Sequence, residues 1–219
     1  MPLLWAYNGE GGCFKAILEV DVKRHYQVSC VLVGDVDKRH IFLTGPPRIG
    51  KTTVILKVTE KLRGEGVRVG GMVSSEILEN GVRVGFKIID LGSGVEGILA
   101  HVNQKDGPKV GKYRVCLRDL ENVGVGAILS ACEAADLIVV DEVGPMELYS
   151  KAFEEAVLKA LESGKIVLGT IHYRAKTSFT SMVRGRRDTE IIEVTYGNRG
   201  SLPKIIAEAI LGRIGESGG

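Results

Sequence analysis

The chain has 219 residues, of which 44% are hydrophobic and 26% charged, and its formal net charge is +2. This length can bury a hydrophobic core, so we expect one main domain. The small net charge argues against nucleic acid as a favoured partner. Because no apolar run approaches the roughly 18 to 20 residues that span a bilayer, we expect no membrane association. The four cysteines lack zinc-finger or disulfide-scaffold spacing, which is typical of reduced thiols in a cytoplasmic protein.

Residues 1–36 form an N-terminal extension without clear periodicity, interrupted by the basic residues 23–25. It is not a secretory signal, because no basic start leads into a long apolar region. Three interpretations stay open for it. It is an extra strand or helix against the sheet, a poorly ordered segment, or sequence upstream of a translation start near Val33.

The alternation of strands and helices becomes clear from His40. The apolar run from His40 to Thr44 predicts a strand, and the apolar spacing from Gly50 to Arg63 predicts an amphipathic helix. Between them lies G-x-x-x-x-G-K-T, the Walker A or P-loop pattern. The candidate nucleotide-binding residues are Gly45, Pro46, Pro47, Arg48, Ile49, Gly50, Lys51, Thr52 and Thr53.

The spacing of this loop suits anion binding. Gly45 and Gly50 let the backbone curl so that successive N–H groups point inward, and the helix that follows adds its positive end. Lys51 would reach the outer phosphates, while the Thr52 hydroxyl would hold Mg²⁺. Since strand, loop and helix agree around the motif, a chance match is disfavoured and we predict nucleoside triphosphates as ligands.

The next segments predict a β-hairpin and a less regular connection. Asn80-Gly81 separates two strand-like runs, 74–78 and 82–89, which is a strong hairpin signal. The hairpin either extends the sheet or covers the nucleotide pocket, and we favour the structural role. Residues 90–111 read as loop-rich and 112–117 as a short strand. Residues 120–135 predict a helix whose first half is weakened by two glycines.

A second candidate site follows a buried strand that begins at Asp136. Four consecutive apolar residues, 137–140, suit a strand covered on both faces of a parallel sheet. An acid at the end of such a strand lies where these sheets bind ligands. Asp141 therefore fits the Walker B role of holding magnesium, and the adjacent Glu142 would orient and deprotonate a water molecule.

The last third of the chain completes the α/β pattern. Ser150 would cap a helix to Ser163, and a buried strand, 165–171, follows. Thr170 and His172 lie at its end, where sensing the γ-phosphate and packing are equally compatible with the sequence. Residues 190–194 predict a final strand and 201–214 a final helix, with 215–219 frayed.

The stretch from Tyr173 to Asp188 is polar and basic. It is either a solvated surface or a lid whose arginine neutralises charge during phosphoryl transfer. The sequence does not choose among Arg184, Arg186 and Arg187 for that role, nor does it define the oligomeric state. The predicted architecture is α/β, a P-loop domain over residues 37–214 with a mostly parallel sheet, flanking helices and an inserted antiparallel hairpin.

Several motifs together resemble the THEP-type nucleoside-triphosphatase family of small P-loop proteins. The most specific is Asp-Glu-x-Gly-x-Met-Glu-Leu at residues 141–148, because the P-loop alone indicates only an NTPase or a kinase. The resemblance covers residues 38–214 in order. Its other stretches are 45–53, 83–86, 110–115, 167–171, 193–195, 198–199 and 202–203.

This resemblance implies a RecA-like core that slowly hydrolyses the terminal phosphate of ATP, GTP, CTP and UTP, with Mg²⁺ as cofactor. It assigns Lys51 and Thr52 to phosphate and metal, Asp141 to the metal, and Glu142 to the catalytic base. Arg48 departs from many P-loops, which have a small residue there, so it either adds a contact or crowds the loop.

Two other functions remain compatible with the motifs. A P-loop small-molecule or nucleoside kinase would share the basic lid, although the Asp141-Glu142 pair argues for activated water and no acceptor pocket is identified. A nucleotide-dependent switch with an RNA or protein partner would use slow hydrolysis as a timer. The near-neutral net charge argues against RNA in that role.

Overall fold

The computed structural model describes residues 3–7, 13–17 and 38–216. The chain divides into two compact units, residues 1–38 and residues 39–219. In the first unit, β1 (Leu3–Tyr7) and β2 (Cys13–Ile17) pair as antiparallel strands. The alternative start near Val33 and residues 217–219 lie outside the described residues. The prediction that fraying begins at residue 215 is wrong for residues 215 and 216, which belong to the last helix.

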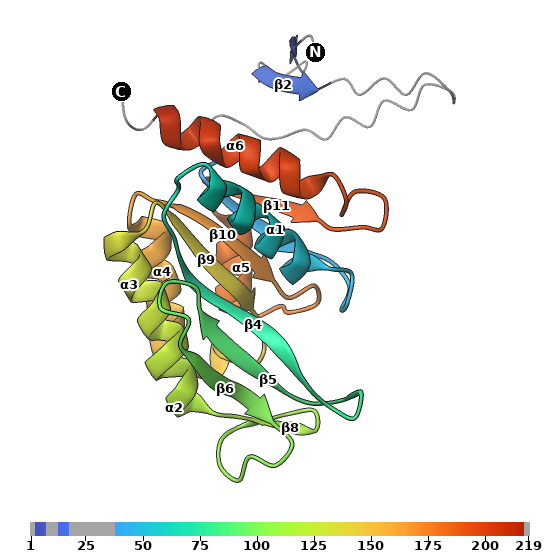
Figure 1. Ribbon diagram of the computed structural model, residues 1–219, viewed down its shortest axis with the longest axis vertical. Coiled ribbons are helices and arrows are strands. Elements are labelled where there is room, and N and C mark those ends of the chain that lie inside the picture. Colours follow the sequence, from blue (N-terminus) through green and yellow to red (C-terminus); the bar gives the residue numbers. More distant parts are fainter. Residues whose placement is uncertain (1–2, 8–12, 18–37, 217–219) are drawn as a thin grey trace. The chain divides into compact units, whose positions relative to one another are not determined.

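The described part of the second unit contains a nine-stranded sheet with the order β11-β3-β10-β9-β4-β5-β6-β8-β7 (Figure 1). The strands from β11 to β4 run parallel, and the remaining pairs are antiparallel. The sheet is therefore a parallel α/β half continued by an antiparallel half. Its strands are β3 (His40–Thr44), β4 (Val69–Glu79), β5 (Val82–Asp90), β6 (Glu96–His101), β7 (Lys109–Val110), β8 (Tyr113–Val115), β9 (Leu137–Val143), β10 (Ile166–Ile171) and β11 (Thr189–Glu193).

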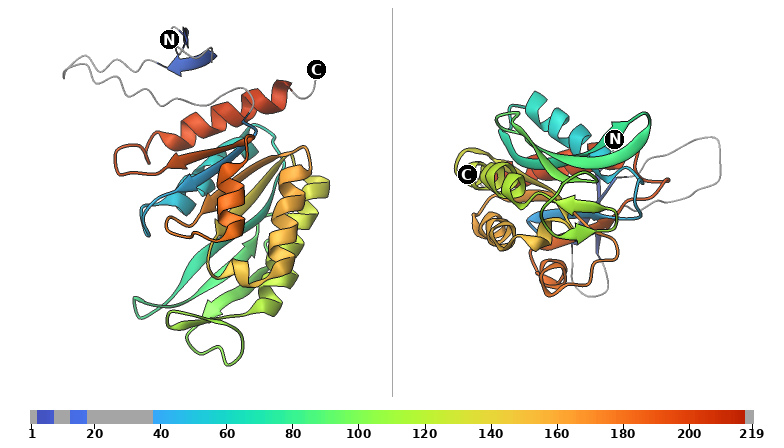
Figure 2. Two further views of the ribbon diagram at one scale, coloured as in Figure 1. Left: turned by 180° about the vertical axis from the view of Figure 1, so that it is seen from behind. Right: turned by 90° about the horizontal axis from the view of Figure 1, so that it is seen from below.

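Helices cover both faces of the parallel half, as the two views of Figure 2 show. Because side chains alternate along a strand, Ile41 and Leu43 of β3 join one core while Phe42 joins the other. All three are fully buried, which explains the continuous apolar run of this strand. The first core contains α1 (Lys51–Gly64) and α6 (Leu202–Glu216); the second contains α3 (Gly126–Ala134), α4 (Lys151–Glu162) and α5 (Ser178–Gly185).

Local signals in the sequence predicted several boundaries correctly. Asn80 and Gly81 have φ angles of 51° and 77°, so both occupy the left-handed conformation that a tight hairpin turn requires. The hairpin of β4 and β5 extends the sheet, as predicted. Ser150 caps α4, since its Oγ accepts a hydrogen bond from the Phe153 N–H at 3.2 Å.

The structure differs from the sequence-based expectation around residues 90–125. The segment predicted to be loop contains β6 and β7, and β6 pairs with β5. Gly97 weakens the strand pattern of β6 in the sequence. A Cβ at this position would lie 3.0 Å from Val123 Cγ2, so glycine allows the segment around Val123 to pack closely against the strand. The predicted helix begins instead as the short α2 (Leu117–Asp119) and the π-helical turn η1 (Leu120–Val125) before α3.

Candidate active site

The loop between β3 and α1 has the backbone shape of an anion cradle. Gly45, Arg48 and Gly50 have φ angles of 143°, 64° and 109°, and α1 begins directly after Gly50. A Cβ on Gly45 would lie 2.8 Å from the Val194 carbonyl oxygen, so glycine is required there for close approach as well as for conformation. The positive end of α1 therefore points into the curled loop.

Lys51 folds back over this loop. Its Nζ donates a hydrogen bond to the Gly45 carbonyl oxygen at 3.2 Å. The ammonium group thus lies beside the backbone that would hold the phosphates, where a positive charge stabilises a polyanion.

Asp141 joins the P-loop to the neighbouring strands. It is 1% exposed at the end of β9. Its Oδ2 accepts from Thr52 Oγ1 at 2.8 Å, and its Oδ1 accepts from Thr170 Oγ1 at 2.6 Å. Thr170 was compatible with sensing or packing, and the structure shows it orienting this carboxylate. Burial raises the pKa of Asp141, while the two hydroxyl donors and Lys51 oppose that rise.

The donor atoms at Asp141 suit a hard cation. The Thr52 hydroxyl and the Asp141 carboxylate both offer oxygen atoms as metal ligands. The hydroxyl donates a hydrogen bond to the carboxylate, and the two oxygens lie 2.8 Å apart. In residues 3–7, 13–17 and 38–216, no group of three or more His, Cys, Asp or Glu side chains has metal-ligand geometry. Mg²⁺ commonly binds through one or two protein oxygens, substrate phosphates and water, so these two residues fit it better than a metal needing a full protein cage.

Glu142 lies next to Asp141 in β9 and has an uncommitted carboxylate oxygen. Its Oε1 is buried and has no hydrogen-bond partner among the described residues. Burial raises the pKa of Glu142 to about 7, the Lys51 ammonium opposes the rise, and Asp141 adds to it. A carboxylate with one uncommitted oxygen and a pKa near neutrality can accept a proton from water.

Glu147, the 4% exposed acid that begins the short turn η2 (Glu147–Tyr149), also belongs to this cluster. A Cβ on Gly144 would lie 3.1 Å from Glu147 Oε2 and 3.6 Å from Glu142 Cδ, so both carboxyl groups converge on Gly144. Burial, then the neighbouring Glu142, raises the pKa of Glu147 to about 8. Glu147 belongs to the 141–148 motif, but its role was not predicted, although three acids lie close together in residues 141–147.

The arginines of the basic segment occupy different positions. Arg184 reaches the end of β3, where its Nη2 donates to Thr44 Oγ1 at 3.3 Å and to the His172 carbonyl at 3.1 Å. Arg186 instead forms an ion pair with Asp188 at 2.7 Å, and Arg187 is exposed. The segment is only partly a solvated surface, because α5 within it contributes Phe179 and Val183 to the core.

Arg48 adds a contact on the outside of the loop. Its side chain is 72% exposed, and its Nε lies 3.9 Å from Glu76 Oε1 on β4. The side chain therefore extends toward the hairpin, and the inserted hairpin borders the phosphate-binding loop. An exposed ion pair of this length contributes little to stability.

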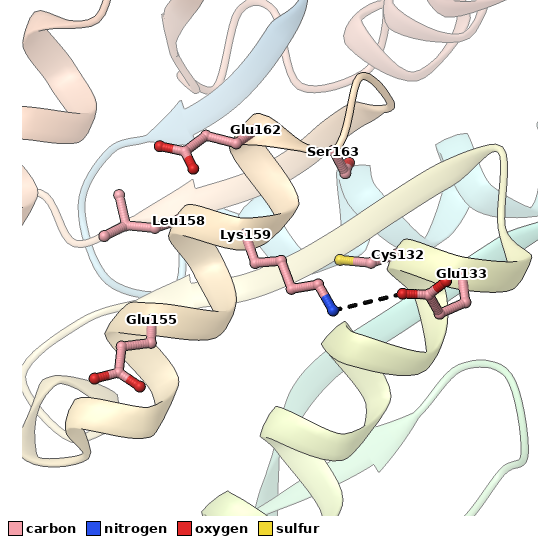
Figure 3. Close-up of a pocket in the computed structure, with 7 residues that line it drawn as sticks. All are labelled: Cys132, Glu133, Glu155, Leu158, Lys159, Glu162 and Ser163. Carbon is pink, nitrogen blue, oxygen red and sulfur yellow. Dashed lines mark hydrogen bonds and ion pairs between the residues drawn. The ribbon is translucent and has the colours of Figure 1, made fainter.

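A separate hollow of about 530 Å³ lies between α3 and α4, away from these residues (Figure 3). Three glutamates line it, and Lys159 forms an ion pair with Glu133 at 3.5 Å. Its net negative lining does not suit phosphate. Its lining residues are Cys132, Glu133, Glu155, Leu158, Lys159, Glu162 and Ser163.

Fold and site together define a P-loop nucleotide-binding protein: a parallel α/β sheet with a curled loop, a lysine and a buried strand-end acid in contact with the loop's threonine. A family model described as NTPase matches residues 40–207. The chain belongs to this NTPase family. No described helix is long and apolar enough to cross a membrane.

Individual relatives agree with this assignment. The protein named nucleoside-triphosphatase THEP1 from Thermofilum pendens is 52% identical over 78% of this chain and 95% of its own length. Its namesake from Methanocaldococcus jannaschii is 44% identical over 78% and 96%. The crystal structure of THEP1 from Aquifex aeolicus has a TM-score of 0.70 at 28% identity, covering 78% of this chain and 98% of that one. A human cancer-related nucleoside triphosphatase has a TM-score of 0.67 at 35% identity, covering 78% and 97%.

Proposed function

We propose that this protein hydrolyses nucleoside triphosphates to nucleoside diphosphates and phosphate, with Mg²⁺, slow turnover and little preference among ATP, GTP, CTP and UTP. The observation that carries the proposal is the arrangement at the end of β9. Asp141 contacts the P-loop threonine, and the adjacent Glu142 keeps a buried carboxylate oxygen that has no hydrogen-bond partner within the described residues. This arrangement supports activation of water beside a bound phosphate.

Each side chain has a distinct part in this reaction. The loop N–H groups and Lys51 bind the outer phosphates and oppose the charge that develops as the reaction proceeds. Thr52 and Asp141 would hold Mg²⁺, which neutralises phosphate charge when bound. Glu142 orients a water and accepts its proton while the water oxygen bonds to the γ-phosphorus. The bond from that phosphorus to the β-phosphate oxygen breaks, and the diphosphate leaves.

The way the nearby arginine is held supports the proposed slow turnover. One nitrogen of the Arg184 guanidinium, Nη2, donates to Thr44 and to the backbone of His172, so these contacts hold the side chain to the fold. Charge neutralisation then depends on Lys51 and the metal. P-loop NTPases without a freely acting arginine finger are slower by about 10³- to 10⁵-fold than those that have one.

The test is phosphate release from ATP, GTP, CTP and UTP, with Mg²⁺ or with excess EDTA, by wild type and by Lys51→Ala. We expect slow release from all four nucleotides, its loss in EDTA, and no release by Lys51→Ala. Product analysis accompanies the assay. Binding without phosphate release, or transfer of the phosphate to an added nucleoside, would contradict hydrolysis and favour a switch or a kinase.

A further inference from the structure

The order of strands gives the bound nucleotide a direction. β3, which leads into the P-loop, lies between β10 and β11. Asp141 and Glu142 lie near the end of β9, which is separated from β3 by β10. The terminal phosphate and the attacking water therefore belong on the β9 side of the loop. The nucleoside end of the same molecule must then extend toward the opposite side, where β11 pairs with β3.

The segment that follows β11 is fastened directly to the P-loop. The Val194 N–H donates to the Thr44 carbonyl at 2.8 Å, and Val194 packs against Gly45. Further along, Arg199 Nη1 donates to the Ile49 carbonyl at 3.4 Å. Residues 194–199 therefore contact the loop near both of its ends, and their position relative to a bound phosphate chain is fixed.

The same segment presents an aromatic ring to solvent. Tyr196 is 77% exposed, more than any other large hydrophobic residue within residues 38–215. The Arg199 guanidinium carbon lies 4.8 Å from the centre of the Tyr196 ring. Asn198 holds the turn, because its Oδ1 accepts from the Thr195 N–H at 2.8 Å and its Nδ2 donates to the Glu193 carbonyl at 2.9 Å. The turn therefore holds the Tyr196 ring at the surface beside a guanidinium, and an aromatic face of this kind is one on which nucleic-acid bases stack.

We propose that Tyr196 and Arg199 form the platform on which the base of the nucleotide stacks. This inference rests on the proposed function, since it concerns the same substrate. A tyrosine ring backed by a guanidinium attracts the π-face of any base. Stacking does not read the hydrogen-bonding edge that distinguishes one base from another, so the platform accounts for a site that accepts ATP, GTP, CTP and UTP alike.

The experiment compares wild type with Tyr196→Ala and Tyr196→Phe by equilibrium binding of the four nucleotides and of inorganic tripolyphosphate, which lacks a base. We expect Tyr196→Ala to weaken binding of all four nucleotides about 5- to 20-fold, with purines affected most. Tripolyphosphate should bind unchanged, and Tyr196→Phe should bind like wild type. Tyr149→Ala removes another exposed tyrosine, 52% exposed, and serves as the matched control.

Three results would overturn the platform: unchanged nucleotide binding in Tyr196→Ala, an equal loss for tripolyphosphate, or a loss confined to one nucleotide. The first two would show that the ring does not contact the base, and the third would show that a base edge is read. These readouts are independent of turnover. If wild type releases no phosphate, the proposed function fails, while binding still decides the platform.

Discussion

The two sides of the P-loop are built in opposite ways. On the β9 side, Asp141 and Glu147 are buried, and the Asp141 carboxylate is held by two hydroxyl donors. On the β11 side, Tyr196 and Arg199 are exposed, and hydrogen bonds of Asn198 hold their turn. The buried side suits chemistry, because low-dielectric surroundings strengthen interactions with developing charge. The exposed side suits tolerant binding of bases that differ in shape.

The largest expected effect separates these sides most sharply. Glu142→Gln should lower kcat by about 10²- to 10⁴-fold, because the amide cannot accept a proton from water. Nucleotide affinity should stay within a few-fold of wild type, since Glu142 acts on water and not on the ground-state phosphates. Single-turnover phosphate release and equilibrium binding measure the two quantities. Full turnover in this variant would remove Glu142 from the mechanism.

His40 begins β3, the strand that leads into the P-loop, and its side chain is buried. A variant of His40 tests whether its buried neutral ring stabilises the fold. Its Nε2 donates to the Leu161 carbonyl at 3.1 Å and its Nδ1 accepts from the Val167 N–H at 3.2 Å, which requires a neutral ring. Burial lowers the pKa of His40 to about 4, although Asp188 partly opposes this. The neutral ring is favoured in the folded state, so its full contribution is present above about pH 6.5.

That contribution should be lost as pH falls from about 6.5 to 4, and it amounts to about 3 kcal/mol at most. Glu142 and Glu147, whose pKa values are raised, change stability in the opposite direction, so wild type must be compared with a variant. The measurement is the free energy of unfolding, obtained from urea denaturation at pH 7.5 and at pH 4.5. Between these two pH values it should fall more for wild type than for His40→Asn. Equal slopes would contradict the neutral-histidine interpretation.

Thr170→Val examines the second hydroxyl on Asp141. The valine keeps the shape but leaves Oδ1 without its 2.6 Å donor. Partners that orient a metal ligand commonly change metal affinity by 10-fold or more, so we expect the Mg²⁺ concentration for half-maximal activity to rise about 10-fold. Thr170→Ser should keep the wild-type requirement. If both variants show the wild-type value, Thr170 has only a packing role.

The smallest expected effect lies on the exposed side. Arg199→Ala removes the cation behind the Tyr196 ring and the contact with Ile49, and should weaken nucleotide binding about 2- to 5-fold with kcat unchanged. Lys204→Ala removes an exposed positive charge from α6 and controls for general electrostatics. A large fall in kcat for Arg199→Ala would mean that both sides take part in the chemistry.

The sequence predicted those parts of the molecule that depend on local spacing. The P-loop, the strand ending in Asp141 and the Ser150 cap each follow from residues within a few positions of one another. β6 was missed because Gly97 interrupts its strand pattern. The reason for this glycine is the close packing of η1, which the neighbouring sequence does not reveal. The sequence could not select Arg184 over Arg186 and Arg187, since Arg184 meets Thr44 across 140 residues. It predicted no role for Arg199, whose partner Ile49 lies 150 residues away.

The position of β3 has a consequence for how the protein is made. β3 is the first strand of the large sheet to leave the ribosome, but its two neighbours are β10 and β11, which emerge well over a hundred residues later. The P-loop strand therefore waits with both edges unpaired while most of the domain is synthesised. Such distant pairing slows folding and exposes strand edges to other chains. Nucleotide added during translation should consequently assist folding only after β11 and residues 194–199 have emerged.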